Sequence, residues 1–68
     1  MKYRIKYIDT EGNTISYLAT EDISHIRSDW SINIDSCPVF KLGMARIFLY
    51  LVKWKIPESN NYIHLEKV

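Results

Sequence analysis

Residues Ser36–Ile56 read SCPVFKLGMARIFLYLVKWKI, and this stretch decides the fold of the chain. Its central part carries only three charges, at Lys41, Arg46 and Lys53. A run with so few polar groups has to be buried on most of its sides. Whether it forms a helix or a strand therefore determines the architecture of the whole molecule.

Several signals in this stretch favour a helix. Ser36 or Cys37 stands at a capping position, and Pro38 follows where its missing N–H costs nothing. Basic residues occupy the expected last turn, and Pro57 comes directly after the stretch. A run of about 18 residues is also long for a strand and ordinary for a helix. We therefore expect one long helix here.

The same residues also fit a strand. The segment Ile47–Val52 is rich in aromatic and β-branched residues, and Lys53–Ile56 alternates polar with apolar. In this alternative, residues 45–56 and 61–67 pair as a second hairpin through the loop at 57–61. The chain would then be a small all-β barrel.

On a helix at about 100° per residue, the stretch presents two apolar faces. We assign to the core the stripe that comprises Phe40, Met44, Ile47, Leu51 and Trp54, flanked by Phe48. The opposite stripe consists of Leu42, Ala45, Leu49 and Val52, with Arg46 and Lys53 beside it. A chain this short has one core, so the second stripe predicts a protein interface. Each Leu or Val left exposed forgoes roughly 1.5–3 kcal/mol relative to burial, so several together can drive association.

The remaining segments predict strands around this helix. Residues 2–9 alternate with Tyr3, Ile5 and Tyr7 on the inner face, a turn follows at 9–13, and residues 14–19 place Ile15, Tyr17 and Ala19 inward. Residues 21–28 form a short helical turn or loop. A third strand follows over Trp30, Ile32 and Ile34, and a last one over residues 62–67 has Ile63 and Leu65 inward. The order strand, strand, strand, helix, strand predicts an α+β fold: a small antiparallel sheet with the helix packed on one face.

Length and composition set limits on function. The chain has 68 residues, which indicates one domain over 1–68, whose core is near the lower limit for independent folding. Nine Lys and Arg against eight Asp and Glu give a net charge of +1, which favours neither nucleic acid nor membrane. A single cysteine and the lack of a signal-peptide pattern indicate a cytoplasmic protein. The apolar run is too short and too charged to span a membrane.

Residues with catalytic or metal-binding chemistry are scattered. Cys37 stands at the expected helix start, with His25 or His64 as its only candidate bases. These three side chains lack the spacing of a metal site. Gly12 and Gly43 are the only glycines, so no phosphate-binding loop is present. We therefore expect no catalytic residues, no metal, no cofactor and no enzymatic activity.

A second candidate surface lies on the first strand. Lys2, Arg4 and Lys6 share its outer face, and Tyr62 and His64 join them if the last strand lies alongside. Basic and aromatic groups interleaved in this way are typical of nucleic-acid-binding surfaces.

The pattern Tyr3-x-x-x-Tyr7-x-Asp9-x-x-Gly12 resembles the opening of the arm-type DNA-binding domains of some tyrosine recombinases. The resemblance covers under a third of the chain and implies DNA binding by the hairpin. The rest of the sequence departs from that family, because its long segment is too apolar and its later strands lack basic residues.

The leading hypothesis is a small non-enzymatic protein-interaction module. It would act as a homodimer, as a regulator or inhibitor that binds a larger host protein, or as both. Nucleic-acid binding is the alternative. The abundance of Ile, Lys, Tyr and Asn is typical of low-GC bacteria and their phages.

Overall fold

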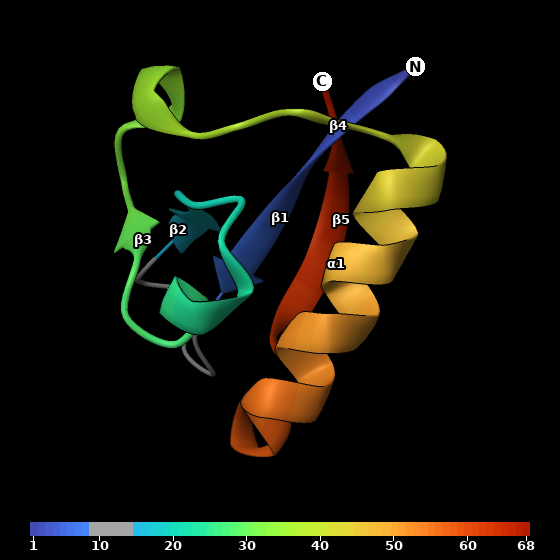
Figure 1. Cartoon of the computed structure of the whole chain (residues 1–68). Coiled ribbons are helices and arrows are strands. Elements are labelled where there is room, and N and C mark those ends of the chain that lie inside the picture. Colours follow the sequence, from blue (N-terminus) through green and yellow to red (C-terminus); the bar gives the residue numbers. More distant parts are fainter. Residues whose placement is uncertain (9–14) are drawn as a thin grey trace.

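The computed structural model describes residues 1–8 and 15–68. In this part of the chain, five strands form one antiparallel sheet, and helix α1 (Leu42–Lys55) crosses one of its faces (Figure 1). The strands are β1 (Lys2–Ile8), β2 (Ile15–Leu18), β3 (Trp30–Ser31), β4 (Phe40–Lys41) and β5 (Ile63–Lys67). The predicted α+β fold is confirmed. The all-β barrel is wrong, because residues 45–56, which it requires as a strand, lie almost entirely in α1. The sheet is also open.

Strand β1 is the centre of the sheet. It pairs with β5 along one edge, from Tyr3 opposite Lys67 to Tyr7 opposite Ile63. Along its other edge it pairs with β4 near its start and with β2 near its end. Strand β3 extends the sheet from β2. Because side chains alternate along a strand, Ile5 faces α1 whereas Arg4 and Lys6 face away from it.

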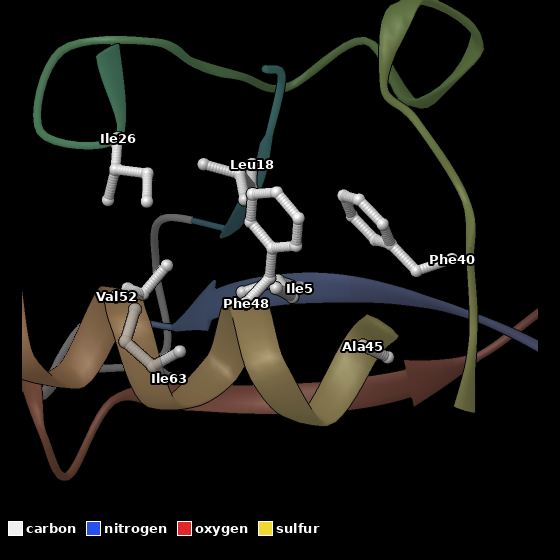
Figure 2. Packing of buried hydrophobic residues seen from close by; sticks show 8 residues of the cluster. All are labelled: Ile5, Leu18, Ile26, Phe40, Ala45, Phe48, Val52 and Ile63. Carbon is white, nitrogen blue, oxygen red and sulfur yellow. The ribbon is translucent and has the colours of Figure 1, made fainter. Parts of the chain in front are cut away.

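The core lies between the sheet, α1 and the segment that joins β2 to β3. Figure 2 shows its buried members, which are Ile5, Leu18, Ile26, Phe40, Ala45, Phe48, Val52 and Ile63. Tyr3 and Tyr7 pack against this cluster, so the predicted inner face of β1 is confirmed. The same holds for Ile63 on β5, which is 2% exposed.

The predicted inner face of β2 is wrong by one residue. Tyr17 lies opposite Lys6 and therefore shares the outer face of the sheet. Leu18 is fully buried instead, while Ile15 is 41% exposed. The register pairs odd-numbered residues of β1 with even-numbered residues of β2, and this register decides which face is inner. The predicted turn at 9–13 lies outside the described residues.

Helix α1 begins later than predicted. A cap at Ser36 or Cys37 is wrong, because residues Ile34–Ser36 form a separate 3₁₀ turn. Phe40 and Lys41 are then held extended by pairing with β1, so the helix starts only at Leu42. Its end at Lys55, shortly before Pro57, agrees with the prediction.

The segment between β2 and α1 is less regular than predicted. A 3₁₀ turn at Ile23–His25 confirms the short helical turn. The third strand, however, covers only Trp30–Ser31, and Ile32 is 79% exposed.

Candidate protein interface

Helix α1 buries most of the stripe that was predicted to form an interface. Ala45 and Val52 are fully buried, and Leu49 packs against the same core cluster. Phe48 completes the buried face and is 5% exposed. Ala45 and Val52 are therefore unavailable to a partner, and their assignment to an interface is wrong. Of the other predicted interface residues, Leu42 and Arg46 are exposed and Lys53 is half-buried, along the flank of the helix.

The opposite side of α1 remains apolar and exposed. Met44 is 48% exposed, Ile47 53%, Tyr50 70% and Trp54 65%. We call these four residues the outward face of α1. Three of them were predicted to line the core. The helix thus has a second apolar face, as expected from the sequence, but on the side opposite to the one expected.

The outward face has a basic border. Helix α1 contains Arg46, Lys53 and Lys55 and no acidic residue. The Lys55 ammonium lies 5.7 Å from the centre of the Trp54 ring, within reach of a cation–π interaction. Tyr and Trp are enriched among the residues that dominate binding energy at protein interfaces. This surface therefore combines apolar anchors with positive charge.

The carboxyl end of α1 is held by the segment between β2 and β3. Arg27 Nη2 donates a hydrogen bond to the Lys55 carbonyl over 3.2 Å, and Arg27 Nη1 lies 3.2 Å from Glu58 Oε1. The positive charge of Arg27 also interacts favourably with the negative end of the helix dipole. The outward face is thereby presented on a helix that is anchored at its end.

The outer face of the sheet carries the predicted basic row, but one member is neutralised. Lys6 Nζ lies 2.7 Å from Glu66 Oε2, and Tyr17 donates its hydroxyl to Glu66 Oε1 over 3.1 Å. The hydrogen bond from Lys6 is the main cause that lowers the pKa of Glu66, and the hydrogen bond from Tyr17 lowers it further. The bond between Lys6 and Glu66 also raises the pKa of Lys6. Burial is the main cause that raises the pKa of Tyr17.

The other residues of the predicted nucleic-acid surface are only partly brought together. His64 lies opposite Lys6 and so shares its face. Tyr62 does not join them, because its ring packs edge-on against Tyr7, on the core side of β1, with centroids 6.1 Å apart. Lys2 lies opposite Lys41 of β4, so the outer face also includes a basic residue that was not predicted to lie there.

Cys37 is buried rather than displayed at a helix start. Its Sγ donates to the Asn33 carbonyl over 3.3 Å, and burial raises the pKa of the thiol. A buried, protonated thiol is a poor nucleophile. Among residues 1–8 and 15–68, no three His, Cys, Asp or Glu side chains are grouped as metal ligands.

A shallow hollow of about 210 Å³ lies beside the end of α1. Its lining residues are Tyr7, Arg27, Trp30, Ile56, Ser59 and Ile63. Pockets for drug-sized ligands are larger, at about 300–1,000 Å³. The outward face of α1 is therefore the strongest candidate site.

No family model, curated protein or solved structure matches this chain. In the described part of the structure, no helix has the length and apolar character needed to cross a membrane.

Proposed function

We propose that this chain is a small non-enzymatic protein-interaction module that binds through the outward face of α1. It acts as a homodimer, or as a regulator or inhibitor that covers a surface on a larger protein. The observation that carries this proposal is the exposure of Ile47, Tyr50 and Trp54 on one side of a single helix, at 53%, 70% and 65%. Contiguous apolar surface of this kind is typical of protein interaction sites.

Burial of the outward face of α1 by a partner is energetically favourable. Full burial of a large apolar side chain is worth roughly 1.5–3 kcal/mol, so the exposed parts of four such residues represent a substantial driving force. A chain of 68 residues also buries a small core, and association would add to it. A partner bound to the outward face would therefore bury apolar surface that the sheet, on the other side of α1, leaves exposed.

The test is a charge placed on the outward face. Ile47→Asp should abolish self-association measured by light scattering, or capture of a partner from an extract of the native host. Val68→Asp is the matched control, since Val68 is 57% exposed but lies after β5 and is not part of α1. Circular dichroism should show the same fold for both variants. Equal behaviour of Ile47→Asp and wild type in both assays would refute the proposal.

Nucleic-acid binding by the outer sheet face is the second candidate. It is supported by Lys2 and Lys41, which lie directly opposite each other, with Arg4 and His64 on the same face. It is weakened by Glu66, which pairs with Lys6. This candidate predicts retention on DNA or RNA that falls steeply with salt and is lost in Lys2→Glu/Lys41→Glu. An absence of binding at low ionic strength would remove it.

A further inference from the structure

A second surface complements the outward face of α1 in both charge and apolar character. Residues 20–36, which we call the acidic segment, contain four acidic residues against one basic residue, Arg27. Their acids are Glu21, Asp22, Asp29 and Asp35, all exposed. The segment also exposes three isoleucines, Ile23 at 45%, Ile32 at 79% and Ile34 at 41%.

We propose that two copies of this chain form a twofold symmetric dimer in which α1 of each protomer covers the acidic segment of the other. This inference rests on the proposed function and names the partner as a second copy. Each basic, apolar helix would meet an acidic, apolar segment. Complementary charge at an interface favours the correct partner and orientation.

The position of the two surfaces allows this arrangement. Figure 1 shows α1 beside β1 and β5, and the acidic segment, which includes strand β3, at the opposite edge of the sheet. Ile26 of the segment is buried in the same core cluster as Val52 of α1, and Arg27 reaches the Lys55 carbonyl. A twofold axis between them and parallel to α1 places each helix over the segment of the partner. Both contacts then form at once and the assembly closes as a dimer.

A direct contact between two outward faces is less favourable. It would bring Arg46, Lys53 and Lys55 of both copies together, with no acidic residue on α1 to separate them. Like charges placed across an interface disfavour that pairing. The acidic segment supplies the opposite charge that α1 lacks.

The size of the surfaces also favours two reciprocal contacts. A stable interface buries about 800 Å² on each partner. A helix of 14 residues is about 21 Å long and about 10 Å wide, so one side of it offers a much smaller footprint. Addition of the acidic segment, with its exposed Ile32 and Ile34, brings the buried surface closer to that requirement.

Charge exchange between two variants tests this dimer. The helix variant is Arg46→Glu/Lys55→Glu, and the segment variant is Asp29→Lys/Asp35→Lys; all four residues are exposed. Wild type should sediment as a dimer. Each variant alone should dissociate at least about tenfold more readily, because both of its contacts now join like charges. An equimolar mixture should recover the dimer, because both contacts in the mixed pair join opposite charges. Circular dichroism of each variant shows whether the fold is retained.

Three outcomes would overturn the dimer. A wild type that stays monomeric up to about 1 mM excludes a second copy as the partner. A segment variant that dimerises like wild type points to a contact between two helices. Folded variants that remain monomeric when mixed refute the charge complementarity. If wild type is monomeric but Ile47→Asp still abolishes capture of another protein, the proposed function holds and only the identity of the partner is wrong.

Discussion

The rings of Phe40 and Phe48 lie stacked, with centroids 4.8 Å apart and an interplanar angle of 26°. Phe40 belongs to β4 and Phe48 to α1, which follows β4 without a loop. Both side chains belong to the buried cluster drawn in Figure 2. Each is at most 5% exposed. The stack therefore joins the end of a strand to the buried side of the next helix, and it helps set which side of α1 faces the sheet.

This stack predicts a large difference between two aromatic residues of the same helix. Phe48→Ala should lower the free energy of unfolding by about 3–5 kcal/mol, because it leaves a cavity in the core. Tyr50→Ala, at a position that is 70% exposed, should change it by less than about 0.5 kcal/mol. Urea unfolding at a concentration where both proteins are monomers provides the measurement. If Phe48→Ala does not fold, Phe48→Leu takes its place. A loss of unfolding free energy in Tyr50→Ala that equals or exceeds the loss at Phe48 would contradict the observed orientation of α1.

A substitution at the start of α1 should stabilise the protein. Lys41 is the N-cap residue, its side chain makes no capping hydrogen bond, and it lies opposite Lys2. Lys41→Asp supplies a cap and removes the like-charge pair, so the free energy of unfolding should rise by about 1 kcal/mol. Lys67→Asp makes the same charge change on β5 without a cap. Thermal unfolding should show a gain for Lys41→Asp only, and an equal gain in both variants would argue against the capping effect.

The Glu66 cluster predicts how stability depends on pH. The pKa of Glu66 is lowered in the folded state by its hydrogen bond from Lys6. The stability that ionised Glu66 contributes is therefore fully present above its pKa in the unfolded chain. It is lost as the pH falls through the lower pKa of Glu66 in the folded protein. Wild type should lose stability more steeply than Glu66→Gln between about pH 5 and pH 3. Denaturant unfolding at several pH values measures this difference. Glu58→Gln, at an exposed ion pair, is the control, and identical pH profiles for wild type and Glu66→Gln would show that the cluster contributes nothing.

The buried thiol predicts slow chemical modification. Cys37 is enclosed, and burial raises its pKa. Native protein should react with iodoacetamide at least about tenfold more slowly than protein unfolded in urea, because the thiol is reached only on opening. Mass spectrometry of timed samples gives both rates. Comparable rates would mean that the thiol is accessible and return it to consideration as a nucleophile.

The parts of the fold that could be predicted from sequence are those with a strong local signal. The alternation of charged and apolar residues around Ile5 correctly gave the inner face of β1. Pro57 correctly marked the end of α1. The α+β class follows from these elements, because a single long helix beside several short strands packs in few ways.

The parts that failed depend on contacts between distant segments. Helix α1 has apolar residues on both sides, so its sequence contains no polar face from which to read the buried one. Its orientation depends in part on β4, whose two residues pair with β1 directly before the helix begins. The inner face of β2 depends on its register with β1, which alternation within β2 does not specify.

The central position of β1 has a consequence for how the protein forms in the cell. Its longest pairing is with β5, so the residues of β1 have to wait for partners that are synthesised about sixty residues later. Until then β1 has an unpaired edge that other chains can contact, and contacts between segments so far apart also close slowly. Nascent chains stalled before residue 63 should therefore be the state most in need of a chaperone.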